Sequence, residues 1–424
     1  MSCIDYLTDK YSYTKEERLS YTEKYGKYLG ELKKFYINPD NGLFVNSSYQ
    51  TGGFEYRMDS DQCYGQGMCV AALAAASRIE PNVSPLLHLA LEGLRRFTGF
   101  DGQYGRGVRA WCPADSDAGR SAIKVIEQQK QNPNPDSDGY YYHLHEDIVT
   151  WEDFSTDQFN SLAGGLTFAW MLGDDKAKSM AAEIAKMFAE KIVEDGYTLR
   201  NPDGTPTRFN DCSGWTYGII PVSEGLLPLL VCAWIADHAD GGVRYDTIMR
   251  DRRGSLVVRF GLYDAHFEPI SSNNNLFMHG LAIWCLRFLT GKSIYKDEWD
   301  TFYWWVKKYN NPFYSLANYA LKANRHDDVV VSKQIGYFPN DKRITPEDNS
   351  ELLDVATVMP WDNRYGYHVS LYGLPISRQN IFFNTFTNNL RNIGLDNEHA
   401  DGKRYWSGAD YIFLYAMARQ FNIV

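Results

Sequence analysis

Two kinds of hydrophobic pattern alternate along this chain. Residues 174–193 repeat apolar side chains at helical spacing, with Lys and Glu on the other face, and Gly196 follows. This pattern predicts an amphipathic helix with one buried face. The preceding segment, 159–172, is apolar nearly all round, which predicts a helix that is covered on most of its sides.

The same pair of patterns recurs elsewhere. Residues 62–77 are apolar nearly all round, and residues 84–97 after them are amphipathic. Residues 276–289 are again apolar, and residues 298–309 are mixed. A last apolar segment covers residues 409–421.

One apolar segment, 218–236, carries prolines. Because proline lacks an N–H and has a fixed backbone angle, we expect Pro221 and Pro228 to kink or divide any helix there. Further candidates are an inner helix at 312–323 and outer helices at 14–35 and 378–392.

The alternation predicts about twelve helices arranged as an inner ring enclosed by an outer ring, because a single helical hairpin cannot bury its own apolar face. We therefore expect one all-α domain over residues 1–424, with little β structure and with all inner helices beginning at one end. Residues 100–150 and 325–371 are expected to be long ordered loops, since both are rich in Tyr, Trp and His.

The segments just before the expected inner helices are rich in Ser, Asp and Asn. Such residues cap helices, because their side chains accept the first backbone N–H groups. Capping explains one polar residue per helix better than it explains clusters of acids beside Tyr and Trp. These segments are residues 57–62, 152–158, 210–215, 271–275, 310–315 and 405–410.

Residues 151–170 read WEDFSTDQFNSLAGGLTFAW, and residues 195–211 read DGYTLRNPDGTPTRFND. With the hairpin pattern, this stretch resembles the six-hairpin glycosidase superfamily, which contains glycoside hydrolases and polysaccharide lyases. The resemblance implies an all-α (α/α)6 toroid with an active site at the starts of the inner helices. It implies paired carboxylates in an inverting hydrolase, or Tyr and His in a lyase.

Glycoside hydrolysis uses two carboxyl groups, which lie about 6.5–9.5 Å apart in inverting enzymes. Our candidate pair is Asp157 with Asp59 or Asp61, since these residues precede two inner helices. Asp153 and Glu152 lie one turn earlier. The alternative interpretation is that Asp61 and Asp157 only cap their helices.

A helix N-terminus lowers the pKa of a carboxyl group, which suits a base better than an acid. The acid therefore needs burial against aromatic side chains to stay protonated. Tyr56, Trp151 and Phe154 are available for this role.

A second cluster lies in residues 139–153. His143 and His145 alternate with Leu144, so on a strand both face the same way, together with Tyr141. A Tyr or His base suits a lyase that removes the proton beside a uronate carboxylate. A metal site is the weaker alternative, and we expect no metal and no cofactor. Groups available to bind the substrate carboxylate are Arg57, Arg106, Arg109, Asn274 and His279.

Aromatic residues make up 15% of the chain, and Tyr and Trp often line surfaces that stack on sugar rings. Trp215 and Trp406 are the preferred stacking residues, although each Trp is also a candidate for the core. His279 falls within an apolar helix, where a core role is the alternative. Further predicted substrate contacts are Asp211, Trp361 and Asp410.

The formal net charge of −10 argues against nucleic acid and against an anionic membrane surface as partners. The seven Cys are scattered without a C-x-x-C motif, so we expect reduced core cysteines. The charged start of the chain is unlike a secretory signal, and we expect a cytoplasmic protein, with lysis or phage release as alternatives. The sequence makes no prediction of oligomeric state.

Three hypotheses remain for function. The first is a glycoside hydrolase acting on an oligo- or polysaccharide through paired carboxylates. The second is a polysaccharide lyase with a Tyr or His base, and the third is a non-catalytic sugar-binding toroid. A terpene cyclase is set aside, because neither Asp174–Asp175 nor Asp327–Asp328 has the third acid of an aspartate-rich metal motif.

Overall fold

The structure is a computed structural model of the chain. It describes residues 20–45, 47–48, 52–58, 62–135, 137–216, 220–267, 272–307, 312–322, 325–337, 343–344, 357–358, 369–370 and 405–424. The expected outer helix at 378–392 and the candidates Asp59, Asp61 and Trp361 lie outside the described residues.

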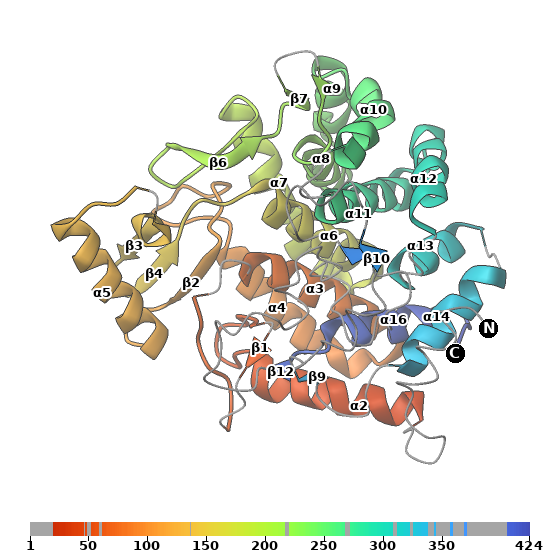
Figure 1. The fold of residues 1–424 in the computed structure, drawn as a ribbon, viewed down its shortest axis with the longest axis horizontal. Coiled ribbons are helices and arrows are strands. Elements are labelled where there is room, and N and C mark those ends of the chain that lie inside the picture. The colour runs from red at the N-terminus through yellow and green to blue at the C-terminus, as the bar shows by residue number, and fades with distance from the viewer. Residues whose placement is uncertain are drawn as a thin grey trace.

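Within these residues, a set of buried helices forms an inner ring (Figure 1). Helix α3 lies between α16 and α6, and α6 and α8 both contact α11. None of the described helices is long and apolar enough to cross a membrane. The inner helices are α3 (Gln62–Ile79), α6 (Thr156–Leu172), α8 (Leu226–Asp240), α11 (Ser272–Thr290), α13 (Pro312–Lys322) and α16 (Ala409–Gln420).

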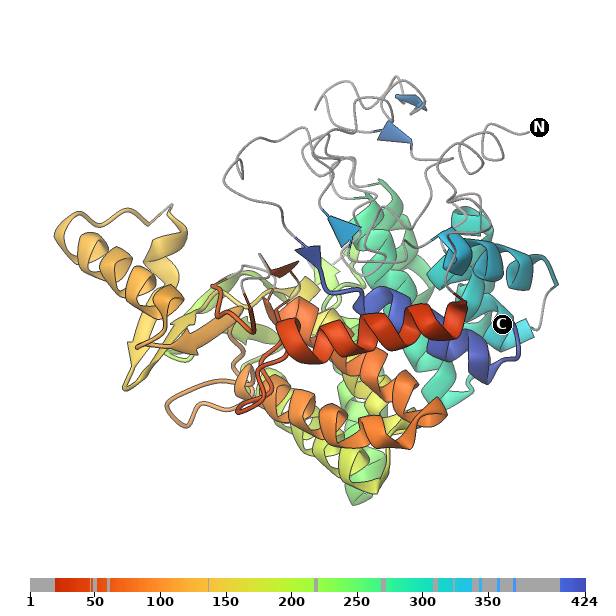
Figure 2. The same ribbon diagram turned by 90° about the horizontal axis from the view of Figure 1, so that it is seen from below.

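Each inner helix has an outer partner that contacts it. The fold is therefore all-α, an (α/α)6 toroid, as the sequence predicts. The partner of α16 is the N-terminal helix α2, and Figure 2 shows the two helices side by side. The outer helices are α2 (Tyr21–Glu31), α4 (Ser84–Arg96), α7 (Asp175–Glu194), α9 (Arg244–Asp251), α10 (Gly254–Phe267), α12 (Ser293–Val306) and α14 (Arg325–Tyr337).

Contacts between α6 and α11 show that these inner helices run in the same direction. Asn160 near the start of α6 donates to the carbonyl of Met278 near the start of α11, with an N···O distance of 3.1 Å. Further along both helices, the Phe168 and Trp284 rings pack edge to face, with centroids 5.1 Å apart. Helices that meet in step along their length are parallel, so both begin at the same end of the toroid.

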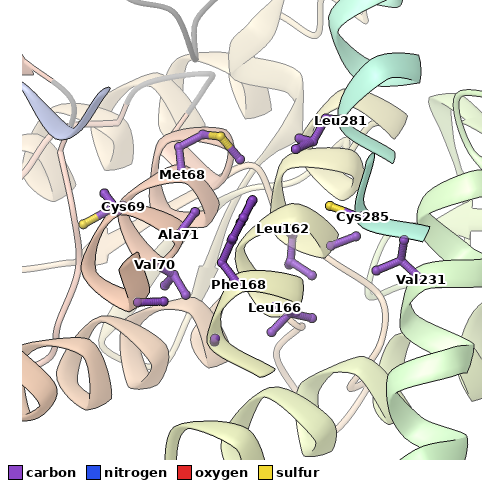
Figure 3. Close-up of a cluster of buried hydrophobic side chains, with 14 of the residues drawn as sticks. Met68, Cys69, Val70, Ala71, Leu162, Leu166, Phe168, Val231, Leu281 and Cys285 are labelled. Carbon is purple, nitrogen blue, oxygen red and sulfur yellow. The ribbon is translucent and has the colours of Figure 1, made fainter. Parts of the chain in front are cut away.

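Aromatic side chains fill the middle of the inner ring. Phe413 of α16 packs on Phe168 with ring centroids 4.9 Å apart, and Phe313 of α13 packs on Trp284 at 5.1 Å. Burying a side chain of this size contributes about 1.5–3 kcal/mol. Figure 3 shows the neighbouring part of this core, with Met68 and Val70 of α3, Leu162 and Leu166 of α6, Val231 of α8 and Leu281 of α11.

A small lobe, residues 110–151, stands out from one side of the rings in Figures 1 and 2. It holds an antiparallel sheet of order β2-β4-β3, and α5 packs against this sheet. The β4 strand leads directly into the start of α6, so the lobe adjoins the end of the toroid where α6 begins. Its elements are β2 (Ala110–Pro113), α5 (Asp117–Gln131), η3 (Asp138–Tyr141), β3 (Tyr142–His145) and β4 (Ile148–Trp151).

The remaining described strands and turns are short. The hairpin of β5 and β6 lies between α7 and α8 in the sequence and carries residues discussed below. The strands and turns are η1 (Leu32–Tyr36), β1 (Ser47–Ser48), η2 (Pro81–Val83), β5 (Thr198–Arg200), β6 (Pro206–Asp211), β7 (Trp215–Thr216), β8 (Ile220–Pro221), β9 (Arg343–Ile344), β10 (Thr357–Val358), β11 (Val369–Ser370) and β12 (Tyr405–Trp406).

The expected break in the segment 218–236 is wrong for Pro228. Helix α8 begins at Leu226, so Pro228 lies in its first turn. The first N–H groups of a helix have no partner within the helix, and a proline there costs no hydrogen bond. Pro221 lies before the helix, in β8.

The expected loops at 100–150 and 325–371 are only partly correct. The first contains α5 and the three-stranded sheet, and the second begins with α14. Among the side chains of α5, only Gly119 and Ala122 are buried. The helix is mostly polar, with a few apolar side chains such as Ala118, Ile123 and Ile126 packed on the sheet, so it lacks the apolar runs by which the inner helices are identified.

Candidate functional site

The start of α6 carries the best-exposed of the candidate carboxylates on the inner ring. Ser155 is the N-cap, and its backbone N–H donates to Oε1 of Gln158 at 2.8 Å. Asp157 follows in the first turn and is half-buried. Its Oδ1 accepts the backbone N–H of Gln158 at 2.9 Å, so the side chain also satisfies one free N–H group of the helix.

Asp157 lies close to the start of the neighbouring inner helix α3. Burial raises the pKa of the Cys63 thiol well above its usual range, and the negative charge of Asp157 adds to this rise. Cys63 follows Asp61 by two residues. Asp59 and Asp61 themselves lie outside the described part of the chain.

Asp410 occupies the first turn of α16, on the other side of α3. Its side chain is fully buried, and its Oδ1 accepts the backbone N–H of Tyr411 at 2.9 Å. Asp410 and Asp157 thus both stand at inner-helix starts that flank α3. Only Asp157 is open to solvent.

A second group of side chains gathers beside the lobe, around the buried carboxylate of Glu152, and we call the surface formed by His143, His145 and Glu152 the lobe face. Its Oε1 lies 3.3 Å from Nε2 of His145, and its Oε2 lies 3.7 Å from Nε2 of His143. The two imidazole rings have centroids 6.3 Å apart, which confirms that both histidines face the same way on β3. His143 is 45% exposed and His145 is 12% exposed.

His145 has a second carboxylate partner. Its Nδ1 lies 2.6 Å from Oδ2 of Asp101, and its ring stacks on Phe100 with centroids 5.6 Å apart. Thr150 Oγ1 lies 3.0 Å from its Nε2. The hydrogen bond with Glu152 raises the pKa of His145, burial of the ring opposes this, and Asp101 raises it further.

Asp153, next to Glu152, holds two arginines. Its Oδ2 accepts from Nε of Arg208 at 2.6 Å and lies 3.5 Å from Nη1 of Arg109. Its Oδ1 accepts the backbone N–H of Arg208 at 2.8 Å. The guanidinium of Arg208 in turn lies over the Tyr141 ring, 4.8 Å from its centroid. Asp153 is thus buried, and both of its carboxylate oxygens have partners.

Trp151 is buried, whereas Tyr56 is half-buried and packs against the cluster of Cys112, Ala122 and Val149. Trp151 is buried in β4, with the guanidinium of Arg109 5.4 Å from its ring centroid. The Tyr56 hydroxyl accepts from the side-chain amides of Asn38 and Asn41 at 3.0 and 2.8 Å.

Asp211 and Trp215 lie apart from both groups. Asp211 is exposed, and its Oδ1 accepts the backbone N–H of Ser213 at 2.7 Å in a local turn. The Trp215 indole N–H donates to the carbonyl of Arg252 at 2.7 Å, which anchors the half-buried ring against the protein. The Arg57 carbonyl, before α3, accepts from Nε2 of Gln62 at 2.8 Å.

His279 lies in the core of the toroid, with no exposed surface. Its Nδ1 lies 3.0 Å from the Ser223 hydroxyl and its Nε2 lies 3.2 Å from Oε1 of Glu298. Both ring nitrogens therefore have partners, in line with the alternative that this histidine serves the core. Asn274 lies on the first turn of α11 and Trp406 lies in β12, but their side chains are outside the described part of the structure.

Six of the predicted site residues fall into two groups. Asp157 and Asp410 stand at the starts of inner helices, while Glu152, Asp153, His143 and His145 lie on the lobe face. Sequence reasoning missed Asp101, Thr150 and Arg208. Asp101 is 44 residues from His145 and Arg208 is 55 residues from Asp153, so only the folded chain joins them.

In the part of the chain that the structure describes, no group of three or more His, Cys, Asp or Glu side chains is arranged to hold a metal ion. The described cysteines are all buried and none forms a disulfide: Cys63, Cys69, Cys112, Cys212, Cys232 and Cys285.

The chain matches no protein-family model and no curated protein. It is similar to a solved structure, the crystal structure of the cellulase Cel9M of C. cellulolyticium in complex with cellobiose. The alignment covers 95% of this chain and 99% of that chain, with a TM-score of 0.45 and 12% sequence identity.

Proposed function

We propose that this protein cleaves glycosidic bonds of an oligo- or polysaccharide, at the end of the toroid where α3 and α6 begin. The observation that carries the proposal is the half-exposed Asp157 carboxylate, which lies beside the entry into α3. Carboxylates at adjoining inner-helix starts are the groups that glycoside hydrolysis requires.

In the hydrolase that we propose, Asp157 is the base. Its Oδ1 accepts the backbone N–H of Gln158 at the start of α6, which holds the carboxylate in place. Asp157 takes a proton from water, and the water oxygen attacks the anomeric carbon. The bond to the leaving oxygen breaks, and that oxygen takes a proton from a second carboxyl group, for which Asp59 and Asp61 are the candidates.

Asp157→Asn tests this proposal on a panel of neutral and acidic oligosaccharides. Asparagine keeps the shape and can still cap the helix, but it cannot take a proton, so we expect turnover to fall by about 100-fold or more. Asp175→Asn is the matched control, because this carboxylate also lies in the first turn of a helix, α7, and is fully exposed. Unchanged turnover in Asp157→Asn would remove Asp157 from the mechanism.

The lobe face favours a second candidate function, a lyase acting on a uronate polymer. Tyr141 and His143 lie on the face that also carries Arg208, and these are the residue types that elimination uses. His143 would take the proton from the carbon beside the uronate carboxylate. The electron pair forms a carbon–carbon double bond, the bond to the leaving oxygen breaks, and that oxygen takes a proton from Tyr141.

Elimination creates a conjugated double bond, so digestion of a uronate polymer would raise ultraviolet absorbance. We expect His143→Gln to abolish that rise and Asp157→Asn to leave it intact. If no oligo- or polysaccharide is cleaved but sugar still binds, a non-catalytic sugar-binding protein is the better description.

A further inference from the structure

Four ionisable side chains form a chain across the lobe face, with carboxylates and imidazoles in alternation. The order is Asp101, His145, Glu152 and His143, and the successive N···O distances are 2.6, 3.3 and 3.7 Å. The two ends are open, with Asp101 63% exposed and His143 45% exposed. The two middle groups, His145 and Glu152, are largely buried from solvent.

The two histidines compete unequally for Glu152. His145 lies between two carboxylates and its ring is fixed by stacking on Phe100. His143 lies farther from Glu152, and its ring is more open to water, which screens the attraction. An opposite charge favours the protonated imidazole, so the proton shared among these groups resides on His145.

We propose that His143 is the proton-accepting group of the lobe face and that Asp101 is a positioning residue that keeps it so. A base must be unprotonated when its substrate arrives. Asp101 holds His145 against Glu152, so the more exposed ring of His143 is the one that a substrate can reach. The inference rests on the second candidate function, the lyase, and identifies the residue that positions its base.

The other groups near this chain do not reverse the order. Asp203, in the β5–β6 turn, feels the charge of His143, and Asp203 is itself held by Thr205. Arg109 and Arg208 both pair with Asp153, whose single negative charge offsets one of their two positive charges. Thr150 meets the Nε2 of His145 and carries no charge.

The test is Asp101→Asn, followed by nuclear magnetic resonance titration of the two labelled imidazoles in the full chain. Asp101 has a left-handed backbone, with φ of 57°, and Asn adopts this conformation readily, so the fold should be kept. We expect the titration midpoint of His145 to fall by about one pH unit, since it loses a nearby charge. The released Glu152 then favours the proton on His143, whose midpoint should rise by about half a unit.

Shifts of opposite sign are the signature of this proposal, because a merely structural role would move both imidazoles together or neither. Asp117→Asn, an exposed carboxylate on α5 of the same lobe, is the control and should move neither midpoint. If the midpoint of His143 falls, or stays fixed while that of His145 falls, the proposal is overturned.

Measurements of lyase activity give an independent test of the proposal. If a uronate polymer is cleaved, the acid side of the kcat/KM pH profile should move to higher pH in Asp101→Asn, since His143 is then protonated over a wider range. If no uronate polymer is cleaved, the lyase fails as the second candidate function, and the titration still decides the inference about Asp101.

Discussion

Asp153 joins the lobe, the β5–β6 hairpin and the start of α6 through one side chain and one amide. Its carboxylate binds the backbone and guanidinium of Arg208, and its own N–H donates to Oδ1 of Asn201 at 2.8 Å. It has a left-handed backbone, with φ of 69°, which Asp and Asn tolerate better than most residues. The residue type is therefore set by backbone conformation as well as by charge.

We expect Asp153→Asn to lower the free energy of unfolding by about 1–3 kcal/mol. Asparagine keeps the backbone conformation, but it leaves Arg109 and Arg208 without their shared negative charge. A fully buried pair would lose more, but Arg208 is 40% exposed and water compensates in part. Urea unfolding measures the change, and Asp203→Asn on the same hairpin is the control; equal losses in both would refute the role of Asp153.

His145 should make stability depend on pH. Its pKa is raised in the folded chain by Glu152, so the folded state binds its proton more tightly than the unfolded chain does. That stabilisation is complete below the unfolded pKa, near pH 6.5, and disappears as pH rises through the folded pKa. His145→Gln should therefore lose more stability at pH 5.5 than at pH 8, measured by urea unfolding, and an equal loss at both values would contradict the linkage.

At the scale of elements, the closest packing is the crossing of α3 and α6. A Cβ on Gly165 would lie 2.4 Å from the carbonyl oxygen of Gly67, and a Cβ on Gly67 would lie 2.4 Å from that of Ser161. Ser161 also donates its hydroxyl to the carbonyl of Tyr64 at 2.5 Å. The apolar pattern predicts both helices, but not that their backbones touch at glycines.

Gly165→Ala should destabilise the protein by about 1–3 kcal/mol, because the methyl group meets backbone that cannot move aside. The same substitution at Gly26 on α2 meets nothing within 4 Å, so it should stabilise by about 0.5–1 kcal/mol through helix propensity. Thermal unfolding of the two variants gives the comparison. Similar changes in both would mean that α3 and α6 can move apart.

The sequence predicts the inner helices, which are mostly apolar, and several of their outer partners, but it misses α5, α9, α10 and α14. The candidate site also contains some features that the sequence predicts and others that it does not. The facing of His143 and His145 follows from strand alternation, which is local. The pairing of His145 with Asp101 depends on how the loop after α4 meets β3, and no local pattern encodes this contact.

At the scale of the molecule, the ring is closed by the two ends of the chain. The rings of Tyr28 and Tyr411 stack with centroids 4.9 Å apart, as do those of Tyr25 and Tyr415 at 4.8 Å. Gly408 has φ of 69°, and a Cβ there would lie 2.0 Å from the Tyr28 ring. The sequence predicts an outer helix within 14–35, but its partner, α16, is almost the whole chain away.

Because α2 and α16 close the ring, a substitution that destabilises the packing of α2 should also loosen α16 and α3. Tyr28→Ala removes a buried aromatic ring and should cost about 3–5 kcal/mol. Because α16 also packs on α3, with Gln420 donating to the carbonyl of Ala75 at 3.0 Å, loosening α16 should expose both helices. Hydrogen exchange should therefore speed up in α16 and α3 together, while Trp304→Ala, at a 62% exposed aromatic on α12, should leave both unchanged. Faster exchange confined to α2 and α16 would mean that the inner ring holds without its closing helix.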